Sequence, residues 1–231
     1  MIYGVFLYFR SNIMNKGKVY IASMNMRGKW ASCPVSCMKI NVTSAQGKQN
    51  KNRRDFSPMT ACSYKGYYNF EAYWQSGKVF EGIPSDRVKT FWKSISSPKR
   101  RYPNSKGKKV LYSCWDEKDE KVKMSYIESR VKVYVPEYYE LVQNREMTLY
   151  WKEQVQQGKD VVIYDFDGPR SDQGEICCEE LTVELLKRKL HDTRHPFGHG
   201  FIVASLIAGI PLNQYIGRKT NIYGPLPLQP I

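Results

Sequence analysis

A carboxylate, an amide and an ammonium occur within one short segment of the chain, at Glu71, Gln75 and Lys78. On a helix, side chains four and then three positions apart lie along one stripe. The aromatic residues that stand beside this stripe and would bury it are Phe70, Tyr73, Trp74 and Phe80. We therefore expect a helix from about residue 69 to residue 80 that forms one wall of a polar substrate site. The alternative is a solvent-exposed helix, because Glu and Gln four residues apart are common on protein surfaces.

Two further groups could contribute to the same site. Trp115 follows a basic segment and precedes Met124 by nine residues. Gly198, His199 and Gly200 stand just before an apolar helix that we expect over residues 201–210. Glycines at the start of a helix let backbone N–H groups approach a phosphate closely, and the helix dipole favours the negative charge. These three residues are therefore candidates for phosphate binding.

A pair of acids, Asp165 and Asp167, follows the apolar residues 160–164. That run has the length and composition of a strand, so a strand would deliver both acids at its carboxyl end. Asp-Phe-Asp-Gly after a strand is similar to the first motif of the haloacid-dehalogenase phosphatases, in which the first acid is the nucleophile and the second the acid/base. Pro169 departs from that motif, and no later pair of acids stands ready to hold magnesium. We keep this phosphatase as a lesser alternative.

Histidines recur every four residues at His191, His195 and His199, a spacing that would align metal ligands on a continuous helix. Pro196 interrupts such a helix. Cys33 and Cys37 have a spacing known in metal sites but lack partners nearby in the chain. We predict no metal site.

The order of these groups resembles the NADAR superfamily over roughly residues 55–209. The matching groups are, in chain order, Phe56-Ser-Pro, the segment of Glu71, Gln75 and Lys78, Trp115 ahead of Met124, the pair Asp165 and Asp167, and Gly198-His-Gly200. The segment with Glu, Gln and Lys is the most specific part. The chain departs from the family at Pro58, where Asn is usual, in lacking Trp-Gly after the acids, and in an additional helix before the glycines.

This resemblance implies a mainly helical (α+β) domain that acts as an N-glycosidase on ADP-ribosyl groups or related phosphoribosyl-linked bases, without a cofactor. It implies that Glu71 acts beside the anomeric carbon, that Gln75 orients ribose hydroxyls or water, and that Trp115 stacks on the base. Asp165 or Asp167 would be the second acid, and the choice stays open. The substrate-binding residues would also include Phe56, Lys78, Arg100, Arg101, Lys106, Gly198, His199 and Gly200.

The chain is strongly basic, with 36 Lys and Arg against 22 Asp and Glu and a formal net charge of +14. This balance favours a polyanionic partner or substrate, such as ADP-ribosylated nucleic acid. The basic residues are concentrated at residues 48–54 and 99–109, which are either phosphate-binding loops or simply solvated ones. The alternative function from another class is a non-catalytic protein that binds a nucleotide or nucleic acid.

No signal peptide and no apolar run of about 20 residues is evident, so we expect no membrane partner. The six cysteines are then expected as thiols in a reducing, cytoplasmic environment. We expect an extension over residues 1–15, with Met14 an alternative start to Met1, one NADAR-like domain over 16–210, and a proline-rich tail over 211–231. Within that domain we expect strands over 18–23, 39–43 and 160–164, a loop over 44–55, and helices over 69–80, 85–95, 121–134, 136–157, 179–191 and 201–210.

Overall fold

The computed structural model describes residues 15–115 and 123–212. Its centre is a four-stranded sheet whose strands are, in spatial order, β2 (Met38–Asn41), β5 (Val161–Asp165), β1 (Val19–Ser23) and β6 (Cys178–Glu180). β2, β5 and β1 are parallel, and β6 is antiparallel to β1. The fold is therefore a mixture of helices and strands. The expected helices with a few strands, near the N-terminus and around residues 160–165, are present, but the domain is not plainly mainly helical. The predicted extension and the predicted tail lie almost entirely outside the described residues.

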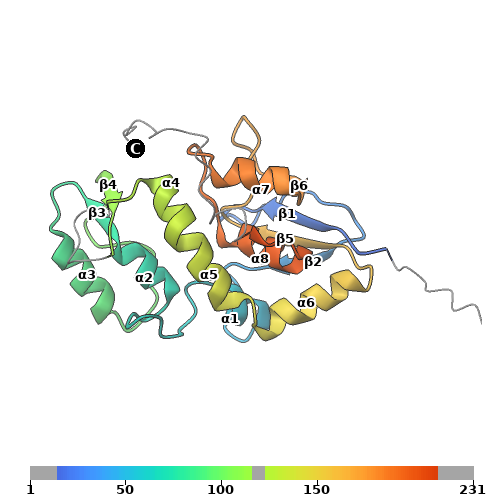
Figure 1. Cartoon of the computed structure of the whole chain (residues 1–231), viewed down its shortest axis with the longest axis horizontal. Helices are drawn as coiled ribbons and strands as arrows, with labels where there is room; N and C mark the ends of the chain where they lie inside the picture. Colours follow the sequence, from blue (N-terminus) through green and yellow to red (C-terminus); the bar gives the residue numbers. More distant parts are fainter. Residues whose placement is uncertain (1–14, 116–122, 213–231) are drawn as a thin grey trace, which may run out of the picture.

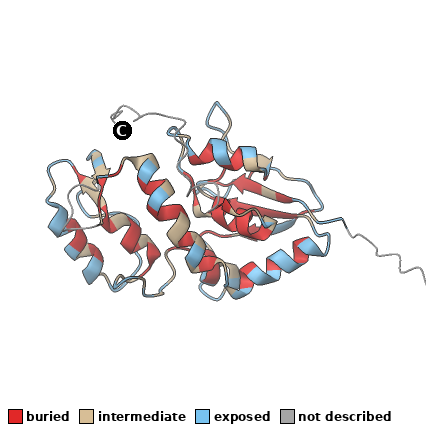
Figure 2. Cartoon of the chain, viewed as in Figure 1, coloured by how far each residue is buried: buried red, intermediate tan, exposed pale blue. Residues whose placement is uncertain are grey.

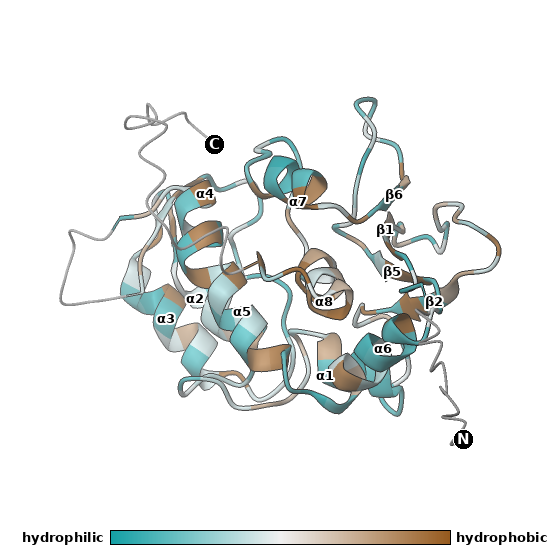
Figure 3. Ribbon diagram, turned by 45° about the vertical axis from the view of Figure 1, so that its right-hand side comes forward, coloured by the Kyte–Doolittle hydropathy of each residue, from teal (hydrophilic) through white to brown (hydrophobic). Residues whose placement is uncertain are grey.

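The helix α8 (His199–Ala208) packs against this sheet and is buried on nearly every side (Figure 2). Its surroundings explain why it is apolar all round, since α5, α6, β1 and β5 all contact it. Figure 3 shows this helix, with its hydrophobic residues, between α5 and α6. The other helices of this half are α1 (Lys51–Phe56), α6 (Glu146–Gln156) and α7 (Val183–Leu190). We expected this last helix to begin at residue 179, but Glu179 and Glu180 belong to β6 and the helix begins at Val183, after its N-cap Thr182.

A smaller unit beside the sheet contains α2 (Phe70–Ser76), β3 (Lys78–Phe80), α3 (Ser85–Ser94) and β4 (Val110–Ser113) (Figure 1). β3 and β4 are antiparallel. The helix predicted to reach Phe80 ends at Ser76, because Gly77 caps it and the next residues pair with β4. Lys78 therefore lies on a strand and not on the helix of Glu71.

A continuous helical segment connects the two parts. It runs through α4 (Tyr126–Ser129), a π-helical turn (Arg130–Tyr134) and α5 (Val135–Val142). We expected a break at Pro136, but this residue lies in the first turn of α5, where proline is tolerated. The chain breaks instead just before α6. Π-helical turns often occur at functional sites, so the position of this one is informative.

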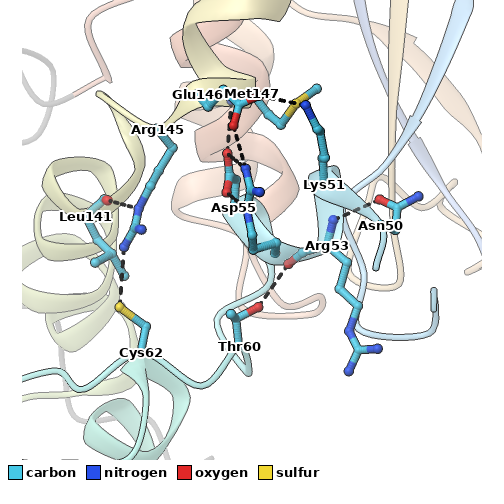
Figure 4. Close-up of polar contacts among 11 residues, drawn as sticks. Asn50, Lys51, Arg53, Asp55, Thr60, Cys62, Leu141, Arg145, Glu146 and Met147 are labelled. Atoms are coloured by element: carbon cyan, nitrogen blue, oxygen red, sulfur yellow. Dashed lines mark hydrogen bonds and ion pairs between the residues drawn. The ribbon is translucent and has the colours of Figure 1, made fainter. Parts of the chain in front are cut away.

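The predicted loop over residues 44–55 contains all of α1 but its last residue, and the start of this helix is capped by Asn50 (Figure 4). The buried carboxylate of Asp55 joins α1 to α6: its Oδ2 accepts the backbone N–H of Met147 at 3.0 Å. The Arg54 guanidinium contacts both Asp55 and Glu146 at 2.8 Å. Asp55 therefore caps a helix that has no side-chain cap of its own.

We predict that Asp55→Ala lowers the free energy of unfolding by about 2 to 3 kcal/mol, because the α6 amide and a guanidinium lose a buried charged partner. Urea denaturation followed by circular dichroism would measure this. Lys51→Ala is the matched control, since it removes only an exposed ion pair to Glu146 and should cost less than about 1 kcal/mol. Equal losses in the two variants would contradict the role of Asp55.

All six cysteines are described, and none forms a disulfide. Within the described ranges, no helix combines the length and the apolar character needed to cross a bilayer.

Candidate functional site

The carboxyl ends of the parallel strands point toward the half of the molecule that contains α2 and α5 (Figure 1). Asp165 is the last residue of β5, the strand with parallel neighbours on both sides. Ligands of sheets with parallel strands commonly bind beyond such carboxyl ends. The residues that converge here form the candidate site.

Asp165 is 2% exposed, and one of its carboxylate oxygens is bound by other groups of the protein. Oδ2 accepts the backbone N–H of Gly200 at 2.8 Å and lies 3.3 Å from Nδ1 of His199. The other ring nitrogen of His199 lies 2.9 Å from the carbonyl oxygen of Val42, which only accepts, so Nε2 carries a hydrogen. Asp165 is thus the anion at the N-terminus of α8.

Gly198, which precedes α8, and Gly200, in its first turn, are needed because the acids pack directly on them. A Cβ added to Gly198 would lie 2.3 Å from Asp165 Oδ2, and one added to Gly200 would lie 2.7 Å from the Asp165 Cβ. The Gly198 N–H donates to the Asp167 carbonyl at 3.3 Å. The amides of Gly198 and Gly200 are therefore bound within the protein, which differs from the phosphate contacts expected of them.

The loop before these glycines is held by Arg130, a buried side chain from the π-helical turn. Its guanidinium donates to four backbone carbonyls, those of Lys189, Leu190, Asp192 and His195. Arg130 thereby connects the π-helical turn to the loop that leads into α8.

Asp167 differs from Asp165 in keeping an exposed surface. The surrounding protein desolvates its carboxyl and, together with the negative charges of Asp165 and Glu71, raises its pKa to about 6, against the opposing effect of His199. Of the two acids, Asp167 is the one that a ligand can reach.

The predicted pair on α2 lies as expected: Nε2 of Gln75 donates to Oε1 of Glu71 at 2.7 Å. Lys78, partly buried at the start of β3, has a pKa lowered by desolvation, while the charges of Glu71 and Asp167 act in the opposite direction. Glu71, Lys78 and Asp167 come from a helix, a strand and a loop, and they form one electrostatic group.

Trp115 is fixed against the end of α2, the helix that carries Glu71 and Gln75. Its indole N–H donates to the Tyr73 carbonyl at 2.9 Å, and its ring stacks on Trp74 with centroids 5.3 Å apart. A Cβ added to Gly77 would lie 2.1 Å from the indole, so the glycine makes room for this ring. The ring face against Trp74 is not free to stack on a base.

Four predicted binding residues make no hydrogen bond or ion pair with the acids in the described parts of the chain. Phe56 is 0% exposed in the core, so its side chain does not face a ligand. Arg100 is exposed, and its Nη1 lies 3.9 Å from the sulfur of Met26 on the loop after β1. Arg101 and Lys106 are exposed on the same loop as Arg100, and within the described residues no hydrogen bond or ion pair links them to the acids.

Tyr134 is a residue that we expected only as the end of a helix over residues 121–134. It ends the π-helical turn and is 8% exposed. Burial and the negative charges of Glu71, Asp165 and Asp167 raise its pKa well above the usual range. A tyrosine on a predicted helix gives no sign of this, because the charges that act on it come from residues distant in the chain.

In the part of the chain that the structure describes, no group of three or more His, Cys, Asp or Glu side chains has an arrangement suited to a metal ion. Comparisons of the chain with protein-family models, with curated proteins and with solved structures found no match.

Proposed function

We propose that this protein is an N-glycosidase that hydrolyses the bond between a base and an ADP-ribosyl or phosphoribosyl group, including such groups on nucleic acid. The observation that supports this most strongly is the convergence of Glu71, Asp165 and Asp167 at the carboxyl end of β5. Breaking an N-glycosidic bond develops positive charge on the ribosyl carbon, and preorganised carboxylates stabilise such charge.

The two acids at β5 suit different roles. Asp165 is bound by Gly200 and faces His199, so it serves to position the start of α8. Asp167 is accessible, and its pKa of about 6 leaves part of the population protonated near neutral pH. A carboxyl group with a raised pKa is suited to general acid catalysis.

In the proposed reaction, the bond from the anomeric carbon to the base nitrogen breaks, and its electrons leave with the base. Asp167 gives its proton to the departing base. Glu71 accepts a proton from water as the water oxygen bonds to the anomeric carbon. Gln75 holds Glu71 in place, and the Lys78 ammonium donates hydrogen bonds to oxygens of the bound sugar phosphate.

The basic surface supports a phosphorylated substrate. Arg100 extends from its loop to the loop after β1, the strand beside Asp165. Together with a net charge of +14, this surface would attract an anionic polymer that carries the scissile bond.

Product analysis tests the proposal. After incubation with ADP-ribosylated guanosine in DNA, we expect mass spectrometry to detect free ADP-ribose and the unmodified base. Absence of both products, from this substrate and from free phosphoribosyl-linked bases, would reject the glycosidase.

A second candidate is a non-catalytic nucleic-acid-binding protein, favoured by the exposed basic residues at 99–101 and 106–109. It predicts salt-sensitive binding of single-stranded DNA that persists in Glu71→Ala and yields no product. The phosphatase alternative requires Asp165 as an open nucleophile, whereas this carboxylate is buried and bound by Gly200.

A further inference from the structure

The hydroxyl of Tyr134 has no hydrogen-bond partner in the described parts of the chain, although the residue is buried, with only 8% of its surface exposed. Its ring packs against Trp74, Phe70 and Tyr138, with centroid distances of 4.9, 5.6 and 6.1 Å. Buried tyrosine hydroxyls nearly always have a partner. This one therefore calls for an explanation.

The neighbouring tyrosine provides the contrast. Tyr138 is stacked almost parallel to Tyr134, at 7°, but its hydroxyl donates to the backbone carbonyl of Phe56. One ring thus has its hydroxyl bound within the core, and the other does not.

The Tyr134 hydroxyl is also not sealed in the interior. Within residues 15–115 and 123–212, the one side-chain polar atom that is both fully buried and without a hydrogen bond is Trp92 Nε1. The Tyr134 oxygen therefore retains access to solvent, at the end of a side chain that is otherwise enclosed.

The charges around this hydroxyl determine which hydrogen bond it can make. Burial and the carboxylates Glu71, Asp165 and Asp167 disfavour the phenolate, so the group stays protonated and acts as a donor. The carboxylates can only accept when ionised. A ligand group between the phenol and a carboxylate must accept from one and donate to the other, as a hydroxyl does.

We infer that Tyr134 contacts the substrate, donating a hydrogen bond to the 2-hydroxyl of the ribose at the scissile bond while that hydroxyl donates to one of the carboxylates. This inference rests on the proposed function for the identity of the sugar. The 2-hydroxyl is chosen because it is adjacent to the anomeric carbon on which Glu71 acts in the proposed reaction. Hydrogen bonds to this hydroxyl strengthen as a glycosidic bond breaks. Tyr134 would therefore select ribose over 2-deoxyribose.

The test is calorimetric binding of ADP-ribose, and of its analogue lacking the 2-hydroxyl of the terminal ribose, to wild type, Tyr134→Phe and Tyr138→Phe. We expect wild type and Tyr138→Phe to bind ADP-ribose about tenfold more tightly than the analogue. Tyr134→Phe should bind both ligands with similar, weaker affinity. Its melting temperature should equal that of wild type, whereas Tyr138→Phe should melt at a lower temperature because it loses an internal hydrogen bond.

A Tyr134→Phe variant that melts at a clearly lower temperature, or that keeps the wild-type preference for ADP-ribose, would overturn the inference. Failure of wild type to bind ADP-ribose would overturn it as well. The proposed function is tested separately by product release: wild type that binds ADP-ribose with the expected preference but cleaves no N-glycosidic bond would reject the glycosidase and leave the Tyr134 contact standing.

Discussion

Glu71→Gln should release ADP-ribose from ADP-ribosylated guanosine about 10²- to 10⁴-fold more slowly than wild type, the usual cost of removing a general base. The substitution keeps the shape of the side chain, and its amide oxygen can still accept the hydrogen bond from Gln75. What the variant loses is the negative charge and the ability to accept a proton. Single-turnover rates followed by mass spectrometry would measure the effect on the chemical step.

Glu81→Gln is the matched control, because Glu81 is an exposed carboxylate in the same small unit of the fold. It should react at the wild-type rate. Unchanged turnover in Glu71→Gln would remove Glu71 from the mechanism, and an equal loss in both variants would indicate a general effect of charge.

Asp167→Asn is expected to have the second large effect, a loss of about 10² to 10⁴ in rate. If Asp167 donates its proton to the base, wild-type kcat/KM should fall as the pH rises through about 6, the pKa to which the surrounding protein raises this carboxyl. The variant should lack this descending limb. Rates measured across the pH range in wild type and variant would show whether the limb belongs to Asp167.

The stability of the same variant provides a control against unfolding. A carboxyl group whose pKa is raised from 3.8 to about 6 binds more protons in the folded state, so wild-type stability falls as the pH rises across that window. Asparagine does not titrate, so the variant lacks this loss of stability with rising pH. Asp167→Asn should therefore be at least as stable as wild type at neutral pH, while the exposed Asp172→Asn should leave the rate unchanged. A slow variant that is also unstable would not support a catalytic role.

Local patterns in the sequence located much of the site. The four-residue spacing of Glu71 and Gln75 appears in the structure as a hydrogen bond across one helical turn. The apolar run before Asp165 is β5, and the segment after Gly198 is α8. These elements depend on periodicity and on capping residues within a few positions, which is why a single sequence is sufficient for them.

Long-range pairing decided other features that the sequence analysis missed. Lys78 belongs to a strand because β4, distant in the chain, pairs with it. Phe56 is enclosed because helices and strands from the whole chain surround it. The central sheet likewise requires β5 to lie between β1 and β2, which are far away in sequence.

By itself, the sequence determined which chemical groups this protein has and which short segments present them: the acids after a strand, the Glu and Gln on a helix, and the glycines before an apolar helix. Only the tertiary structure decided which of them remain accessible. It buried Asp165 against the start of α8, left Asp167 open, and enclosed Tyr134, at the end of the π-helical turn, where the charges of the carboxylates act on it. The physical reason is that solvation, pKa and unpartnered hydrogen-bonding groups depend on neighbours from distant parts of the chain, and these neighbours exist only after packing.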